Sequence, residues 1–275
     1  MGFYSASQLT QDVRRHGVEV RAVDINRSDW DCTLEAGEGG VAAMRLGLRM
    51  VKGLSEDSGR LIVEQRPADG FHGTQQLVEQ VGLDRRELGV LASAGALEAL
   101  EGHRHRARWA VAGVEEPTPL LTSMDRYEAA PLLRKPTEGQ DIVADYQSLG
   151  LTLGRHPLQL LRHRLDRYRY LQAQRLPELA GGTAVSVAGI VITKQRPGTA
   201  SGVIFVTLED ETGYMNLVVW STVAEQYRAA LLNAKLMGVE GELQIEGEVI
   251  HVVAKRLVDH SEMLGNLVVT SRDFR

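Results

Sequence analysis

The sequence is poor in cysteine, with Cys32 as the single example in 275 residues. One cysteine cannot form an intramolecular disulfide, and it excludes a zinc site built from several thiolates. The sequence also lacks an uninterrupted run of about 18 apolar residues, the length that a membrane-spanning helix requires. Its N-terminus lacks the basic-then-apolar pattern of a signal peptide. We therefore expect a cytoplasmic protein with no membrane partner.

The sequence also has no excess of positive charge. The chain has 31 Lys and Arg against 36 Asp and Glu, a net charge of −5, which excludes a uniformly basic nucleic-acid coat but allows local basic patches. The phosphate loop G-x-x-x-x-G-K-[ST] and the nucleophile elbow G-x-S-x-G are also missing. With 43% hydrophobic and 24% charged residues, the composition predicts one or two globular domains without a complete active site.

The first stretch, residues 1–40, predicts a short helix and a strand. An amphipathic pattern covers residues 7–16, which Ser5 or Ser7 can cap and Gly17 can end. Residues 18–23 then alternate between polar and apolar side chains, as in a half-buried strand. A helix and a strand make a poor domain alone, so this stretch is interpreted as the end of something larger.

Residues 41–113 have helical periodicity and contain an internal repeat. Gly53 is followed by an apolar residue and then by the cap-type Ser55, and the same order recurs 29 residues later at Gly82 and Asp84. An apolar residue also precedes each glycine by one or two positions. Each copy predicts a helix, a tight glycine turn and a second helix. The N–H groups of such a turn and of the next helix converge and attract phosphate.

The hairpins supply most of the residues that we predict to contact DNA. These are Arg49, Lys52, Gly53, Leu54, Ser55, Gly82, Leu83, Arg85 and Arg86, with Arg45 also flanking the first turn. The common hairpin pattern has a second glycine where this chain has Ser55 and Asp84. Both residues are good N-caps, and Asp84 would repel a phosphate, so two purely structural hairpins are the alternative.

Residues 114–182 hold six of the eight prolines and predict a connecting region. Its first part is expected to be an extended loop, followed by helices from residue 136 or 137 to 149 and from 157 to about 170. Six arginines stand against the single acid Asp166 in residues 155–175. A solvated helix face explains part of this basic segment, and contact of Arg162 and Arg164 with a phosphate backbone is the alternative.

The period changes to two over residues 183–260. Strands are expected at Val185–Lys194, Val203–Glu209, Tyr214–Trp220, Lys235–Ile245 and Val249–Leu257, with a helix at residues 222–232. Five strands with a helix between the third and fourth match the partly open barrel called the OB-fold. Residues 261–275 are expected to form a tail.

The predicted barrel offers aromatic side chains for stacking bases and cations for following a backbone. Lys194, Arg196, Phe205 and Trp220 are the candidate residues. However, residues 183–260 hold six Lys and Arg against nine Asp and Glu. Because the barrel is acidic on balance, docking to a protein is the alternative to binding single-stranded DNA.

Two further pairs were considered as metal ligands. Asp29 and Asp31 flank a tryptophan, and His103 and His105 lie two residues apart in an arginine-rich segment. Neither pair has a third ligand in register, and metal-dependent phosphoryl transfer needs more. Both pairs are interpreted as surface residues, so no cofactor is expected to bind this chain.

Several separate motifs occur along essentially the whole chain. They are Met1–Tyr4, Gln11–Arg21, Asp29–Glu35, Arg45–Arg49, Val51–Leu54, Leu91–Leu97, Gly154–Leu158, Gln195–Ala200, Leu208–Gly213 and Ser271–Arg275. In this order they resemble the bacterial C-family DNA polymerases. The sequence is most similar to the error-prone branch of the polymerase III alpha-subunit family, which acts in damage-induced translesion synthesis.

The resemblance implies an α+β multidomain fold taken from the C-terminal region of such a polymerase. The implied segments are the end of the fingers (1–40), a tandem helix-hairpin-helix domain (41–113), a proline-rich linker with helices (114–182), a five-stranded OB-fold (183–260) and the tail (261–275). Met1 matches a methionine inside a family motif. We therefore expect the catalytic palm, and the Mg²⁺ that it uses in the full-length enzyme, to lie upstream.

The function that the resemblance implies is DNA positioning without catalytic power. The hairpins would contact duplex DNA, and the barrel would face template single strand or a partner. The upstream polymerase domains are the other implied partner. A protein-interaction module that docks accessory mutagenesis factors or the sliding clamp is the alternative.

Overall fold

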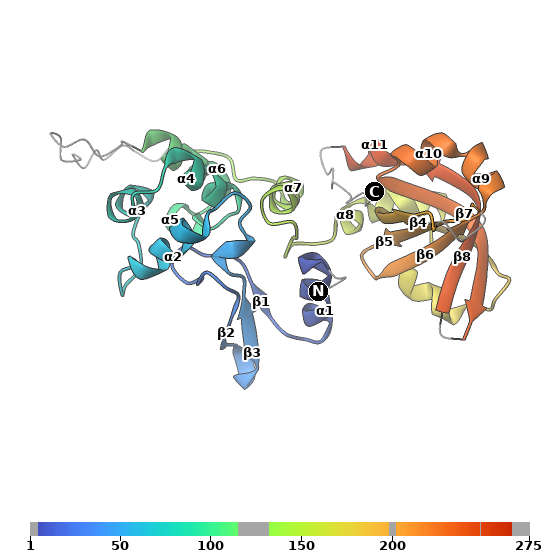
Figure 1. Cartoon of the computed structure of the whole chain (residues 1–275), viewed down its shortest axis with the longest axis horizontal. Helices are drawn as coiled ribbons and strands as arrows, with labels where there is room; N and C mark the ends of the chain where they lie inside the picture. The colour runs from blue at the N-terminus through green and yellow to red at the C-terminus, as the bar shows by residue number, and fades with distance from the viewer. Residues whose placement is uncertain (1–4, 115–131, 198–201, 248, 266–275) are drawn as a thin grey trace. The chain divides into compact units, whose positions relative to one another are not determined.

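The computed structural model describes residues 5–114, 132–197, 202–247 and 249–265. The chain divides into two compact units, Met1–Gly154 and Arg155–Arg275, and each is described by itself (Figure 1). The division splits the predicted proline-rich linker between the two units. The loop predicted around Pro117 and the end of the tail, residues 266–275, lie outside the described residues. No helix in the described ranges has the length and hydropathy of a membrane span.

The first unit begins with a helix and a small sheet. Helix α1 (Ala6–Arg15) starts at a capping box made by Ser5 and Gln8, and it ends before Gly17, whose φ is +79°. Strands β1 (Val20–Arg21), β2 (Thr33–Ala36) and β3 (Ala42–Arg45) follow in the spatial order β1-β3-β2. The predicted first helix and the predicted strand are therefore confirmed.

The prediction of helical structure from residue 41 onward is wrong at its start. Strand β3 pairs in parallel with β1 and antiparallel with β2, so its backbone hydrogen bonds belong to the sheet. The 3-10 turns η1 (Glu38–Gly40) and η2 (Leu48–Met50) flank it. The segment before Gly53 is thus a strand and one 3-10 turn, because cross-strand pairing outweighs local helical periodicity.

Helices form the rest of the first unit. They are α2 (Glu56–Glu64), α3 (Thr74–Val81), α4 (Arg85–Ser93), α5 (Glu98–Glu101), α6 (Arg104–Gly113) and α7 (Glu138–Ser148). Leucines of α3 and α4 pack in one apolar core with buried residues from the region of the small sheet. Leu149 and Leu151 also belong to this core. Arg104 ties α7 to this core, because its buried guanidinium bonds to Asp141 at 2.8 Å and to Asp145.

The second unit is a closed five-stranded barrel with the spatial order β4-β5-β6-β8-β7. Its strands are β4 (Ala184–Gln195), β5 (Ile204–Glu209), β6 (Tyr214–Val219), β7 (Leu236–Glu246) and β8 (Val249–Asp259). Helices α9 (Ser221–Gln226) and α10 (Arg228–Asn233) lie between β6 and β7, and α11 (Ser261–Leu264) follows β8 (Figure 1). The predicted OB-fold is confirmed, and its barrel is closed where a partly open one was expected.

Helix α8 (Pro157–Leu165) packs against this barrel and is followed by η3 (Asp166–Tyr168) and η4 (Ala173–Glu178). Arg162 on α8 makes a two-armed ion pair with Glu211 in the β5–β6 turn, with N–O distances of 2.6 and 2.7 Å. Asp210 in the same turn is buried and accepts the backbone N–H of Ala173. The turn thus fastens the helical segment to the barrel.

His156 lies at this junction with its side chain 11% exposed. Its Nδ1 accepts the backbone N–H of Leu158 and so caps α8, and its Nε2 lies 3.9 Å from Glu209. Burial lowers the pKa of His156 to about 4, and Arg162 adds to this, while Glu211 and Asp210 oppose it. A charged imidazole would also be unfavourable at a helix N-terminus.

We expect the stability of the second unit to fall as the pH drops from 6.5 to 4, because the unfolded chain then binds a proton that folded His156 rejects. The loss is on the order of 3 kcal/mol. The His156→Asn variant keeps a cap acceptor and cannot titrate, so its stability should depend less on pH in this window. Urea unfolding at several pH values measures the difference, with His163→Asn as the control on the same helix. Parallel profiles for the parent and His156→Asn would contradict the assignment.

Candidate nucleic-acid surfaces

Both glycine turns have the backbone conformation that the repeat predicts. Gly53 has φ +89° and Gly82 has φ +73°, in the left-handed region that favours glycine. The leucine after each glycine is buried in the core. Ser55 then caps α2 by accepting the N–H of Ser58, and Asp84 caps α4 by accepting that of Glu87 at 2.6 Å.

The two hairpins meet through equivalent positions. The Ser58 hydroxyl donates to the Glu87 carboxylate, and these residues are separated by the same 29 positions as the two glycines. Arg86 also reaches across, with its Nη1 3.0 Å from the carbonyl oxygen of Gly53. The N-termini of α2 and α4 therefore lie side by side, and their unsatisfied N–H groups form one polar surface.

The cations predicted at the first hairpin are engaged within the protein. Arg45 is buried and paired with Glu35 at 2.8 Å, which corrects its expected position at the turn. Hydrogen bonds from Arg45, reinforced by Arg21, lower the pKa of Glu35 to about 2. Arg49 pairs with Asp31.

Lys52 is engaged as well. Its Nζ donates to the carbonyl oxygens of Tyr146 at 2.8 Å and Gln147 at 3.2 Å, near the C-terminal end of α7. The first turn of α2 additionally presents two exposed acids, Glu56 and Asp57. The first hairpin is therefore less favourable for phosphate than its sequence indicates.

The second hairpin carries the more accessible positive charge. Arg85 is exposed at the first position of α4, and across the part of the chain that the structure describes its side chain makes no ion pair or hydrogen bond. Arg86 is exposed beside it and keeps its contact with Gly53. The carboxylates of Asp84 and Glu87 accept hydrogen bonds in the capping box of α4. Arg85 thus stands where the helix N-terminus already favours an anion.

The barrel presents two aromatic side chains outward from neighbouring strands. Phe205 on β5 is 37% exposed and pairs with Val218 on β6, and Trp220, two residues further on, is 52% exposed. A Cβ placed on Gly202 would lie 3.4 Å from Ser221 Cβ and 3.9 Å from Arg196 Nη2. Arg196 therefore lies near the residue that follows Trp220, and the three candidates share one region of the barrel.

The strand register adds residues that the sequence reasoning missed. Thr207 pairs with Asn216, and Asn216 pairs with His251 on β8, so these three side chains extend the outward face beside Phe205. The Nδ1 atom of His251 is buried and has no hydrogen-bond partner in the described structure. The alternation of buried and exposed positions along β5 and β6 is the signal that could have identified this row.

Two other predicted barrel and helix cations have structural partners. Lys194 Nζ donates to the carbonyl oxygen of Leu232 at 2.9 Å, at the end of α10. In the basic segment, the acid that pairs with Arg162 comes from the β5–β6 turn, and Arg175 pairs with Glu178 at 3.0 Å. Two of the six arginines in residues 155–175 thus pair with acids that lie outside that window. Arg164 stays exposed and makes a long contact of 3.5 Å with the Met263 carbonyl.

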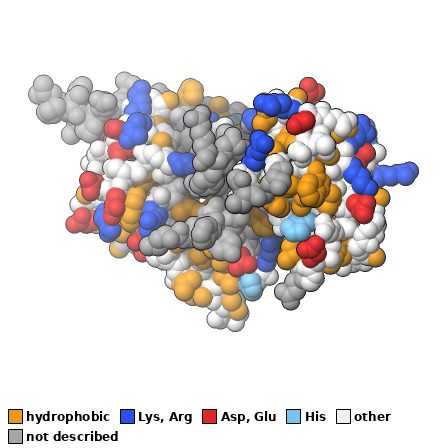
Figure 2. Space-filling view, turned by 45° about the vertical axis from the view of Figure 1, so that its right-hand side comes forward, with side chains coloured by type: hydrophobic (Ala, Val, Ile, Leu, Met, Phe, Trp, Pro, Cys, Tyr) orange, Lys and Arg blue, Asp and Glu red, His pale blue; other side chains and the backbone are white. Residues whose placement is uncertain are grey.

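The remaining candidate pairs also have local partners. The Oδ1 atom of Asp29 lies 3.9 Å from Nη1 of Arg66. His103 caps α6 by accepting the N–H of Arg106 at 3.3 Å. On the face shown in Figure 2, basic and acidic side chains are interspersed and do not form one continuous basic surface. On this face, a DNA contact would therefore be local.

Two family models match the chain. The model described as a helix-hairpin-helix motif matches residues 17–107, and the one described as an OB-fold nucleic acid binding domain matches residues 185–259. These ranges contain the two hairpins and the barrel. Together they support a nucleic-acid-binding role for the chain.

Curated proteins named error-prone DNA polymerase match the whole chain. The proteins from Methylococcus capsulatus, an Azoarcus species and Alkalilimnicola ehrlichii are 50%, 52% and 50% identical to it. Each alignment covers 100% of this chain but only 28%, 26% and 27% of the respective relative. The chain therefore spans about a quarter of the length of these relatives.

Lys52 was predicted to contact DNA, and its bonds to two carbonyl oxygens also give it a role in the fold. We expect Lys52→Ala to destabilise the first unit by about 1 kcal/mol, because two carbonyl groups near the end of α7 lose a cationic donor. Lys52→Met, which keeps most of the aliphatic stem, should lose a similar amount. Urea unfolding tests this prediction. Two unchanged midpoints would show that the lysine contributes nothing to the fold.

Proposed function

Because the chain is related over its whole length to the error-prone DNA polymerases, we propose that it positions DNA for such a polymerase during damage-induced translesion synthesis. The hairpins contact duplex DNA, and the barrel contacts template single strand. The observation that carries the proposal is the side-by-side arrangement of α2 and α4, linked by Ser58 and Glu87. Two helix N-termini at one surface can follow a phosphate backbone.

Within this surface, we assign the main phosphate contact to the second hairpin. Gly82 allows close approach of a backbone, and the exposed Arg85 supplies a positive charge at the helix N-terminus. The first hairpin contributes the Gly53–Ser55 turn, whereas its acids Glu56 and Asp57 disfavour a phosphate at α2 itself. A contact of this kind positions DNA without reading its sequence.

The barrel contact rests on stacking. Phe205 and Trp220 expose aromatic rings to solvent, and stacking on such rings contributes about 1–3 kcal/mol per base. Arg196 is close enough to accompany the backbone. Two rings on an acidic barrel support modest affinity, which suits a template strand that must keep moving.

Catalysis belongs to other parts of the polymerase in this proposal. Mg²⁺ acts at the palm, and this chain holds no cofactor of its own. Its immediate partners are DNA and the upstream polymerase domains.

A second candidate function is a protein-interaction module. The six Lys and Arg against nine Asp and Glu in residues 183–260 favour it, because an acidic barrel repels a phosphate backbone. The partners would be accessory mutagenesis factors or the sliding clamp.

We expect Arg85→Ala to weaken duplex binding to a similar extent for all sequences. The slope of log affinity against log salt should fall by about 0.9, because one phosphate contact is lost. Arg60→Ala is the matched control, since Arg60 lies on α2 and pairs with Glu56 at 2.7 Å. Fluorescence anisotropy with a labelled duplex measures both variants across a salt series.

An unchanged slope for Arg85→Ala would remove the second hairpin from the proposal. Undetectable duplex binding by the parent chain at low salt would favour the protein-interaction function.

A further inference from the structure

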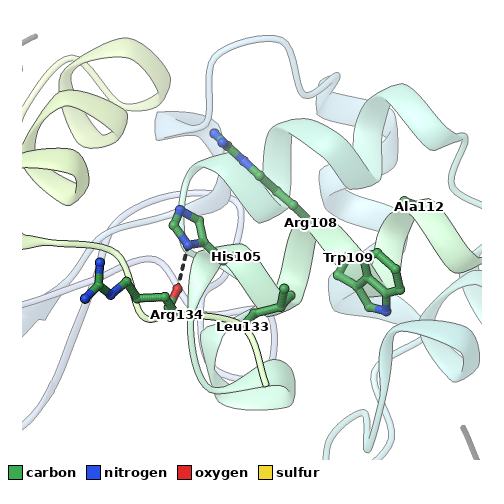
Figure 3. Close-up of a pocket in the computed structure, with 6 residues that line it drawn as sticks. All are labelled: His105, Arg108, Trp109, Ala112, Leu133 and Arg134. Carbon is green, nitrogen blue, oxygen red and sulfur yellow. Dashed lines mark hydrogen bonds between the residues drawn. The ribbon is translucent and has the colours of Figure 1, made fainter. Parts of the chain in front are cut away.

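The outward face of α6 carries a row of side chains that neither the hairpins nor the barrel uses. His105, Arg108, Trp109 and Ala112 follow one another at helical spacing and, together with Leu133 and Arg134, line a cavity of about 360 Å³ (Figure 3). The opposite face of α6 is the core face, with Ala107 and Val111 buried. The row is therefore not required to fill the core.

Specific contacts hold the two walls of this cavity. His105 Nδ1 donates to the carbonyl oxygen of Arg134 at 2.7 Å, which ties the segment after residue 132 to α6. Arg108 Nη2 lies 3.3 Å from Ser93 Oγ at the end of α4. Arg134 lines the cavity and is itself an exposed residue.

The lining combines apolar surface with positive charge. Trp109 is 55% exposed and offers a flat ring, and Ala112 and Leu133 supply further apolar surface. Arg108 and Arg134 bring two positive charges, and among the residues that the structure describes the lining includes no acid. A ligand that matches has a flat apolar ring and a negative charge.

We propose that this cavity binds a nucleotide of single-stranded DNA, with a base stacked on Trp109 and neighbouring phosphates along the strand contacted by Arg108 and Arg134, whose side chains extend in different directions (Figure 3). That the ligand is DNA and not a free nucleotide rests on the proposed function. The site uses none of the residues assigned to the hairpin turns or to the aromatic face of the barrel. Stacking on tryptophan with arginine beside it tolerates every base, so the contact is independent of sequence.

The test measures binding of the full chain to a labelled oligothymidylate of about six nucleotides, a length within the range that one such groove covers. Trp109→Ala should weaken binding between about 5-fold and 150-fold, the equivalent of one lost stacking contact. Trp109→Phe should retain most of the affinity. Arg108→Ala should lower the salt slope by about 0.7, the value for one phosphate of a single strand.

Two controls separate this site from others. Arg106→Ala removes a cation from α6 outside the cavity and should leave binding unchanged. An oligonucleotide that carries 5-bromodeoxyuridine should crosslink to the peptide that contains Trp109. Because Trp109 is exposed, circular dichroism should show that the variants fold normally.

Unchanged oligothymidylate affinity in Trp109→Ala overturns the inference, as does the absence of measurable binding by the parent at low salt. If Trp220→Ala weakens binding while Trp109→Ala does not, the barrel contact stands and this site fails. If Trp109→Ala alone weakens single-strand binding and Arg85→Ala leaves duplex binding intact, this site stands without the proposed hairpin contact.

Discussion

The arrangement of the first unit depends on one backbone constraint, which applies at both hairpins. A glycine at positive φ, a buried leucine and a capping residue must follow one another so that a helix begins immediately after the turn. Gly53 and Gly82 both satisfy it, and the contact between Ser58 and Glu87 then joins the two hairpins at equivalent positions. A residue with a Cβ at either glycine would strain the backbone, and Asn or Asp would strain it least.

The cations of the chain divide into those that build the protein and those that remain accessible. Arg45, Arg104 and Arg162 are paired with carboxylates at or near buried positions, where breaking one partner leaves the other uncompensated. Lys52 and Lys194 bond to carbonyl groups near the ends of helices. Accessible positive charge is left at a few places, among them Arg85, and this distribution explains how a chain of net charge −5 can still offer local sites for phosphate.

The sequence predicted the elements whose determinants are local. Alternation in residues 183–260 predicted all five strands, and the helix predicted from residue 136 or 137 to 149 is observed as α7, because such signals act within a few residues. The strand Ala42–Arg45 was missed, since its partners lie on other segments. In the candidate site, too, features set by neighbouring residues could be predicted and long-range contacts could not. The turn of Gly53 could be predicted, whereas the pairing of Arg162 with Glu211, 49 residues away, required the folded barrel.

The most direct test of this account is amide hydrogen exchange of the full chain with and without a primed duplex. If the paired hairpins hold the phosphate backbone, the amides of residues 82–87 should exchange more slowly in the complex, because bound phosphate protects the N–H groups at the start of α4. Protection confined to the barrel, or no change at these amides under conditions where the duplex is bound, would contradict the central claim.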